Sequence, residues 1–280
     1  MPKATSTHPV FLRNDEWAAV RRCYNSRIMK ARTMARIPKS VLDPSHPWKL
    51  PRLESGFPSH PYKMTGAAWK SLLRRAELAD AEAQWEVAER HFDGCKDRSG
   101  KILVSRSTRK GREWLQRAAE GGFAAAQNTL GVLLGSGDGF DKDPDKALIW
   151  LKRAFRGADR CAANNVAITY REVGNFRRAV AWFRRSVSLG DDSARIQLGI
   201  HYYWGIGIRQ NAAAAIRCFR QATKGRNLSE ADRDDAFFYL GIAHLEGKGV
   251  KASIQTARRL LKRAKVDNDH PAAQRVLSAL

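Results

Sequence analysis

The stretch LGIHYYWGIG, residues 198–207, joins a leucine–glycine pair to three aromatic residues and a Gly-x-Gly. A Gly-x-Gly belongs either to a phosphate-binding loop or to a turn that ends a helix. A phosphate loop needs a strand before it and a helix N-terminus at the phosphate, and the flanking sequence predicts neither context. Because glycine reaches left-handed backbone angles at low cost, the stretch predicts a helix C-terminus followed by a turn.

The same pattern occurs at two other places, as LGVLLGSGDG from Leu130 and LGIAHLEGKG from Leu240. Alignment on this leucine gives five repeats of about 36 residues, each with an alanine four positions before the leucine column and a small residue directly after it. Residues four apart lie on one face of a helix, so each repeat is predicted to begin with a helix that packs through this face. The leucine column is Val87, Leu130, Val166, Leu198 and Leu240.

A second helix is predicted in each repeat by a small–large–small stripe, with Trp114, Trp150 and Trp182 as the large residue of the first three repeats. Residues of N-cap type precede this stripe at the same distance in all five repeats, and their side-chain oxygens can accept hydrogen bonds from the first turn of a helix. These residues are Ser107, Asp143, Asn175, Asn211 and Ser253. The sequence therefore predicts five helix pairs in register.

The second repeat shows a resemblance to a known family most clearly. Its matching residues are Ala126, Leu130, Gly131, Gly137, Gly139, Asp143, Lys146, Ala147, Trp150, Lys152 and Ala154. They resemble the Sel1-like repeat, a relative of the tetratricopeptide repeat, and the resemblance covers about residues 79–265. It implies an all-α fold, an α/α solenoid of about five Sel1-like or tetratricopeptide-like helix pairs with a basic N-terminal extension. It also implies a scaffold or adaptor for protein–protein interaction, without catalysis.

The domain organisation follows from these patterns. We predict a basic N-terminal segment with an amphipathic helix at residues 1–37, a Pro-rich linker at residues 38–65 and the repeats at residues 66–280. The repeats are placed at about residues 79–122, 123–157, 158–190, 191–225 and 230–266, with a C-terminal cap at residues 270–280. The first repeat carries an insertion near Cys95–Arg109, and Trp69, Leu72 and Ala76 upstream of it imitate a second helix.

Composition narrows the classes of function. The formal net charge is +22, which attracts polyanions and acidic proteins. The sequence contains no run of 18 apolar residues that would suggest a membrane span, and no secretory signal is evident. The four cysteines form no CxxC pair, which favours reduced thiols and a cytoplasmic location. Since no HExxH, GxSxG or metal-ligand cluster occurs, we predict no enzyme activity, no cofactor and no metal.

A peptide-binding groove is the first candidate site. In solenoids of this kind the first helices line the concave side, and positions two before, two after and five after the leucine column face it. The candidate contacts are Asn128, Asn164, Arg171, Ile196, Ile200, Tyr203, Phe238 and Ile242. They would bind a hydrophobic peptide, either from a partner protein or from the Pro-rich segment of this same protein. The alternative is that superhelical packing buries these side chains against neighbouring helices.

A basic stripe on the second helices is the other candidate site. Its residues stand two and three positions after the tryptophan column: Lys152, Arg153, Arg184, Arg185, Arg220, Lys262 and Arg263. They could contact the phosphate backbone of a nucleic acid without reading its sequence. A solvated helix face is the alternative interpretation. The predicted partner is therefore another protein or peptide, with nucleic acid as the second hypothesis.

Overall fold

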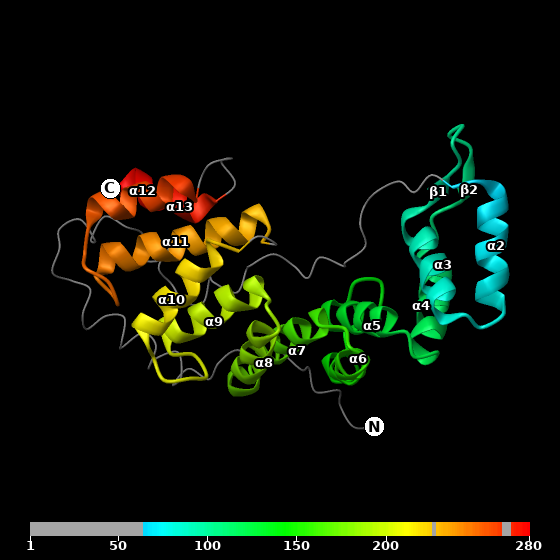
Figure 1. Ribbon diagram of the computed structural model, residues 1–280, viewed down its shortest axis with the longest axis horizontal. Helices are drawn as coiled ribbons and strands as arrows, with labels where there is room; N and C mark the ends of the chain where they lie inside the picture. The colour runs from blue at the N-terminus through cyan, green and yellow to red at the C-terminus, as the bar shows by residue number, and fades with distance from the viewer. Residues whose placement is uncertain (1–63, 226–227, 265–269) are drawn as a thin grey trace, which may run out of the picture. The chain divides into compact units, whose positions relative to one another are not determined.

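The computed structural model describes residues 64–225, 228–264 and 270–280, and these residues form helices connected by short turns (Figure 1). The described residues fall into an N-terminal unit, residues 64–169, and a C-terminal unit, residues 170–280. The segment predicted for residues 1–37 lies outside the described residues, as does the Pro-rich linker apart from residues 64 and 65. The all-α fold of the sequence prediction is confirmed.

The N-terminal unit contains the first two repeats and the first helix of the third. Its helices are α2 (Gly66–Glu77), α3 (Ala81–Asp93), α4 (Thr108–Glu120), α5 (Ala124–Ser136), α6 (Pro144–Arg156) and most of α7 (Cys161–Glu172). The insertion of the first repeat is an antiparallel hairpin of β1 (Cys95–Lys96) and β2 (Ile102–Val104), which the sequence did not predict as strands. Upstream of the first repeat, α2 buries Leu72 and Ala76, as expected for a helix that imitates a second helix.

The C-terminal unit begins at the end of α7 and contains the remaining repeats. Its other helices are α8 (Phe176–Ser188), α9 (Asp192–Trp204), α10 (Ala212–Ala222), α11 (Glu230–Glu246), α12 (Ile254–Arg263) and α13 (Pro271–Ala279). The last of them, α13, is the helix expected in the C-terminal cap. At its start His270 accepts a hydrogen bond from Ala273 N through Nδ1, and its Nε2 lies 3.0 Å from Asp235 Oδ1 of α11.

All five predicted N-caps are confirmed, and this explains where each second helix begins. The side chain of each accepts a hydrogen bond from the backbone N–H three residues later, at distances of 2.9 to 3.4 Å. Such a cap stabilises a helix by about 1 kcal/mol because it satisfies an N–H group that has no partner in the helix. In addition, Pro144 occupies the first turn of α6, where its missing N–H has no cost.

The Gly-x-Gly stretch is a helix end, as predicted. Gly205 ends α9 in the left-handed conformation, with φ of 73°, and Gly207 two residues later has φ of 68°. The backbone N–H of Gly205 donates to the carbonyl of His201, which closes the last turn of the helix. No strand precedes these glycines among the described residues of this repeat, so the turn reverses the backbone between α9 and α10.

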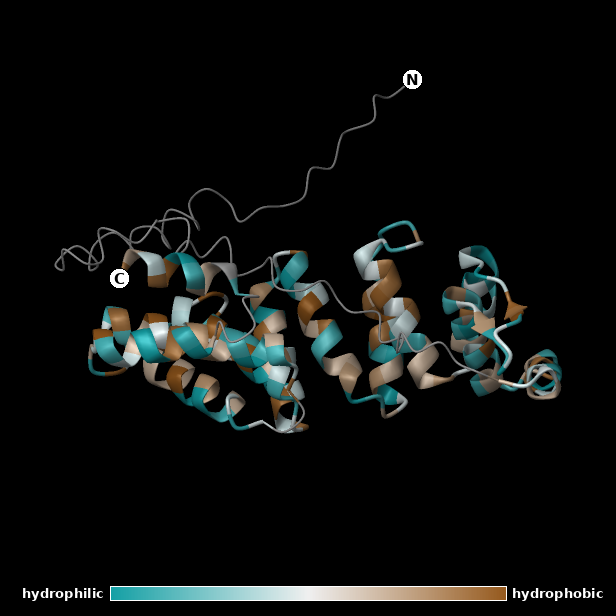
Figure 2. Cartoon of the chain, turned by 90° about the horizontal axis from the view of Figure 1, so that it is seen from above, coloured by the Kyte–Doolittle hydropathy of each residue, from teal (hydrophilic) through white to brown (hydrophobic). Residues whose placement is uncertain are grey.

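The two helices of a repeat pack closely because small residues stand at their contact. An added Cβ at Gly199 of α9 would lie only 2.6 Å from Cε1 of Phe219 in α10. Likewise, an added Cβ at Gly131 of α5 would lie 2.6 Å from Cγ of Leu151 in α6. The apolar residues of each helix therefore meet across the pair, and hydrophobic and hydrophilic residues alternate around the helices in Figure 2.

Candidate functional site

In each unit a hydrogen bond joins the first helices of two successive repeats. In the N-terminal unit, Asn165 of α7 donates a hydrogen bond of 2.9 Å to Asn128 of α5. In the C-terminal unit, Tyr203 of α9 donates to Glu246 of α11. We call the groove positions of α3, α5, α7, α9 and α11 the first-helix face. They are Trp85, Glu89, Phe92, Asn128, Val132, Gly135, Asn164, Ile168, Arg171, Ile196, Ile200, Tyr203, Phe238, Ile242 and Leu245.

The first-helix face of the N-terminal unit is partly covered and contains polar side chains among apolar ones. Asn128 and Asn164 are both half-buried. The Asn164 Oδ1 atom is buried, and so is the Nε1 atom of half-buried Trp85 in α3, yet neither has a hydrogen-bond partner among the described residues. A buried polar atom without a partner costs about 1–3 kcal/mol. These two atoms are therefore the first groups in this face that a bound peptide could satisfy.

Glu89 lies one turn after Trp85 on the same face of α3 and is a buried carboxyl group. Its side chain is 4% exposed, and Oε2 lies 3.7 Å from Arg90 Nη1. The other oxygen, Oε1, has no hydrogen-bond partner among the described residues. Burial raises the pKa of Glu89 to about 7, and Asp93 and Glu86 add to the shift while Arg90 opposes it. At neutral pH the face therefore contains a carboxyl group that is partly protonated.

This carboxyl group predicts a pH dependence of stability. In the unfolded protein the pKa of Glu89 returns to about 4.5, so between pH 4.5 and 7 the folded protein binds more protons than the unfolded one. The contribution of Glu89 to the free energy of unfolding therefore decreases as the pH rises through this range, by roughly 1–3 kcal/mol. We expect Glu89→Gln to remove this decrease, measured by urea unfolding at pH 5 and pH 8. The control is Glu82→Gln, an exposed position on the same helix. An equal change in unfolding free energy between pH 5 and pH 8 for wild type and Glu89→Gln would contradict the expectation.

The first-helix face of the C-terminal unit differs from the sequence prediction. The five apolar candidates, Ile196, Ile200, Tyr203, Phe238 and Ile242, are buried, with exposed fractions between 0% and 7%. They belong to one core cluster with residues of α10, α12 and α13. Their expected exposure in a groove is wrong, because the helices of this unit approach closely enough to cover them. The alternative of burial against neighbouring helices is the one that the structure shows.

Polar groups accompany this apolar cluster at its edge. The hydroxyl of Tyr203 donates to Glu246, and the Lys248 ammonium lies 4.1 Å from the centre of the Tyr203 ring and 4.9 Å from that of Trp204. The half-buried Arg171 donates a hydrogen bond of 2.7 Å to Gln197. Of the eight predicted groove residues, Asn128 and Asn164 lie in the N-terminal unit and the other six in the C-terminal unit.

The predicted basic stripe is exposed except for Lys152, which is half-buried. Many of its guanidinium groups lie over aromatic rings. Arg153 lies 4.8 Å from the centre of the Trp150 ring, and Arg185 lies 5.6 Å from that of Trp182. Arg184 donates a hydrogen bond of 2.9 Å to the Tyr202 hydroxyl. These contacts give several stripe residues a role in covering the aromatic column, and contact with phosphate groups stays a prediction.

The described residues contain no group of three or more His, Cys, Asp and Glu side chains that could hold a metal ion. His201 of the helical core has a packing role. His201 is fully buried, its Nδ1 lies 2.8 Å from the Ile206 carbonyl, and burial lowers its pKa to about 4. Over residues 64–225, 228–264 and 270–280, no helix has both the length and the apolar character required to cross a membrane.

The repeats match a family model described as the Sel1 repeat, at residues 81–123, 124–159, 169–191, 192–227 and 235–265. These matches together cover more than half of the sequence. The chain belongs to the Sel1 repeat family. Proteins of this family generally mediate protein–protein interaction and are typically non-catalytic scaffolds.

Two solved structures have a fold similar to that of this Sel1 repeat protein. The first is c5321, a protective antigen of uropathogenic Escherichia coli strains, with a TM-score of 0.59, 25% identity and coverage of 70% of this chain and 40% of that chain. The second is a Sel1 repeat protein from Oxalobacter formigenes, with a TM-score of 0.59, 19% identity and coverage of 82% and 85%.

A similar curated protein is the DAP3-binding cell death enhancer 1 of Mus musculus, 28% identical over 141 residues. The match covers 49% of this chain and 21% of the mouse protein, so the chain spans about a fifth of the length of this relative. None of these similarities supports the nucleic-acid hypothesis.

The residues that the structure brings to attention in this face differ from those that the sequence analysis selected. Trp85 and Glu89 stand in the predicted groove columns but were not selected as candidates, and Asn165 was not considered. The available signal was a polar residue in a column that is apolar in the later repeats: Glu89 stands where Ile200 and Ile242 stand.

Proposed function

We propose that this Sel1 repeat protein is a non-catalytic scaffold that binds an extended peptide segment on the first-helix face of its N-terminal unit. The observation that carries the proposal is the pair of unsatisfied polar atoms in this face, Trp85 Nε1 and Asn164 Oδ1. An extended backbone presents carbonyl acceptors and N–H donors in alternation, which matches one donor and one acceptor on the protein. Both residues are half-buried, and the proposal requires their side chains to rotate so that these atoms reach the surface.

The candidate residues have different roles in this proposal. Asn128 and Asn164 remain contacts in this proposal, and Arg171 remains one for the C-terminal unit. The five buried apolar residues act as core that holds α9 and α11 together, because a peptide could reach them only if these helices separated. The proposed peptide is therefore held mainly by hydrogen bonds from amide and indole groups.

The test uses the full-length protein and peptides selected from a randomised display library. We expect wild type to enrich peptides, and the double variant Asn128→Ala/Asn164→Ala to bind them about 5- to 150-fold more weakly, since two hydrogen bonds contribute roughly 1–3 kcal/mol. The dissociation constant is measured by fluorescence anisotropy. The matched control is Arg153→Ala/Arg156→Ala, which changes two side chains of α6 in the same unit and should leave binding unchanged. The proposal fails if no peptide is enriched, or if the asparagine variant binds as tightly as wild type.

A further inference from the structure

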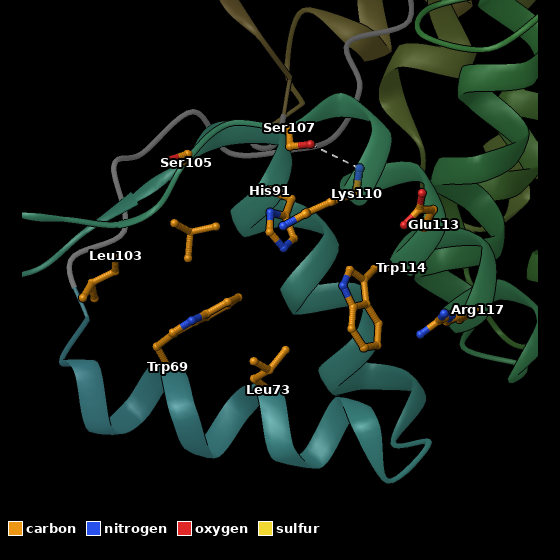
Figure 3. Close-up of a pocket in the computed structure, with 11 residues that line it drawn as sticks. Trp69, Leu73, His91, Leu103, Ser105, Ser107, Lys110, Glu113, Trp114 and Arg117 are labelled. Carbon is orange, nitrogen blue, oxygen red and sulfur yellow. Dashed lines mark hydrogen bonds between the residues drawn. The ribbon is translucent and has the colours of Figure 1, made fainter.

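A pocket with a volume of about 610 Å³ lies within the N-terminal unit, between α2, the end of α3, the strand β2 and α4 (Figure 3). Trp69 and Leu73 of α2 form one side, and Trp114 of α4 forms another. Leu103 of β2 closes the end near the hairpin. This volume lies in the range of pockets that hold a side chain or a small ligand, and the lining residues are distinct from the first-helix face.

The pocket exists because the first repeat has a hairpin where the other long-loop repeats have a tight turn. In those repeats the second glycine of the turn lies close to the first residue of the second helix of the preceding repeat. An added Cβ at Gly207 would lie 2.5 Å from the backbone of Phe176, and one at Gly249 would lie 2.8 Å from that of Ala212. In the first repeat, Leu103 takes this place, 4.0 Å from a Cβ built on Gly66, the first residue of α2. The longer hairpin thus lies against α2 and forms one wall of the pocket.

The charged side chains that line the pocket are two cations and one carboxylate. Lys110 and Arg117 of α4 both line it, and the Arg117 guanidinium lies 4.8 Å from the centre of the Trp114 ring. Glu113 also lines it, and its carboxylate lies 3.5 Å from the guanidinium of Arg109, a cation that does not line the pocket. The local charge therefore favours an anion.

His91 is a second, independent indication of a ligand. It is 9% exposed, it lines the pocket, and its Nδ1 atom has no hydrogen-bond partner among the described residues. Figure 3 shows its ring pointing toward the space above Trp69, beside the side chain of Lys110. The Trp69 and His91 rings are 6.1 Å apart in an edge-to-face arrangement. A polar ring edge and an ammonium group therefore converge on an aromatic cavity.

We propose that this pocket binds a protein segment in which a bulky apolar side chain stands next to a carboxylate. The apolar group packs on Trp69, Leu73 and Trp114, and the carboxylate lies beside Lys110. The site is separate from the peptide-binding face of the proposed function and does not depend on it. A carboxylate of this kind comes either from the C-terminus of a polypeptide or from an aspartate or glutamate side chain, and the two sources share the same recognition chemistry.

The titration of His91 supplies a direct readout. Burial lowers the pKa of His91 and the charge of Lys110 lowers it further, while a hydrogen bond with the Ser105 backbone and the charge of Glu113 oppose the shift. A carboxylate placed beside Lys110 favours the protonated imidazole, so the pKa of His91 rises when the ligand binds. A ligand that binds elsewhere leaves this titration unchanged.

The experiment titrates the full-length protein with four short peptides and follows His91 by NMR. One peptide is acetyl-Gly-Ser-Gly-Phe with a free C-terminus, and its neutral match ends in an amide. The other is acetyl-Gly-Phe-Asp-Gly-amide, and its match has asparagine in place of aspartate. We expect at least one acidic peptide to bind about tenfold more tightly than its neutral match and to raise the pKa of His91. The acidic peptide that binds identifies the source of the carboxylate.

Two variants complete the test. Lys110 is exposed, so Lys110→Met should fold like wild type and bind the acidic peptide about 5- to 10-fold more weakly. Lys70→Met removes the same charge from an exposed position of α2 that does not line the pocket, and should bind as wild type does. Asn128→Ala/Asn164→Ala should also keep this binding, which separates the two sites. Equal binding of acidic and neutral peptides, no binding of any, or an unchanged affinity of Lys110→Met would overturn the proposal.

Discussion

The Gly207→Ala variant is expected to lose about 2–5 kcal/mol of unfolding free energy, one of the largest effects of any single methyl group in this protein. Two costs combine. Gly207 has φ of 68°, where an L-amino acid is strained by about 1–2 kcal/mol. The added Cβ would also lie 2.5 Å from the carbonyl carbon of Phe176 and 2.6 Å from its Cβ, so the backbone must move and overpacking adds about 1–3 kcal/mol.

Gly190→Ala is the matched control for this prediction. Gly190 also has a left-handed backbone, with φ of 91°, but an added Cβ would meet no atom within 4 Å. It should therefore show the backbone strain alone, about 1–2 kcal/mol. Both variants are compared with wild type by urea unfolding followed by far-UV circular dichroism. An equal loss for the two variants would mean that the turn after α9 does not pack against the first residue of α8.

Features determined by local chemistry could be predicted from the sequence. The start of α10 follows from Asn211, whose side chain accepts from Ala214 N at 2.9 Å, and its position is set by residues three apart. The end of α9 follows from Gly205, because only glycine adopts left-handed angles at low cost. These signals act within one turn of helix, so they do not depend on the rest of the fold.

The exposure of the first-helix face could not be predicted in the same way. Whether Ile200 faces a groove or a core depends on how closely α9 and α11 approach, which is a property of the tertiary packing. One signal was nevertheless available in the sequence. The α9 helix carries apolar or aromatic residues at groove positions as well as at core positions, and a helix that is apolar on all sides is a buried helix. Reading Ile196, Ile200 and Tyr203 together would have favoured burial.

The pocket also lay beyond sequence reasoning. The length of the first repeat revealed an insertion, but a strand of three residues, Ile102–Val104, gives no periodic signal of its own. The pocket needs Trp69 and Trp114, which are 45 positions apart, to line one cavity together with the hairpin. Only the packing of α2 against the first repeat brings them together.

Phe219→Ala is the second variant with a large expected effect, a loss of about 3–5 kcal/mol of unfolding free energy. Phe219 of α10 is fully buried in the core cluster of the C-terminal unit. Its ring stacks on Tyr239 of α11 with centroids 5.2 Å apart and an angle of 11° between the ring planes. It therefore joins the second helix of one repeat to the first helix of the next. Truncation to alanine removes the stacking on Tyr239 and the packing within the core cluster, and it leaves a cavity. Urea unfolding measures the loss of stability.

A second substitution decides whether this loss reflects specific packing between the helix pair. Gly199→Ala alone should destabilise the protein, because its Cβ would lie 2.6 Å from Cε1 of Phe219. In the Phe219→Ala background that ring is absent, and alanine is favoured over glycine in a helix by about 1 kcal/mol, so the same substitution should cost little or restore stability. The sum of the two single losses should therefore exceed the loss of the double variant by at least about 1 kcal/mol. If the loss of the double variant equals the sum of the two single losses, Gly199 is not required to make room for the ring of Phe219. The small residue after each leucine would then need another explanation.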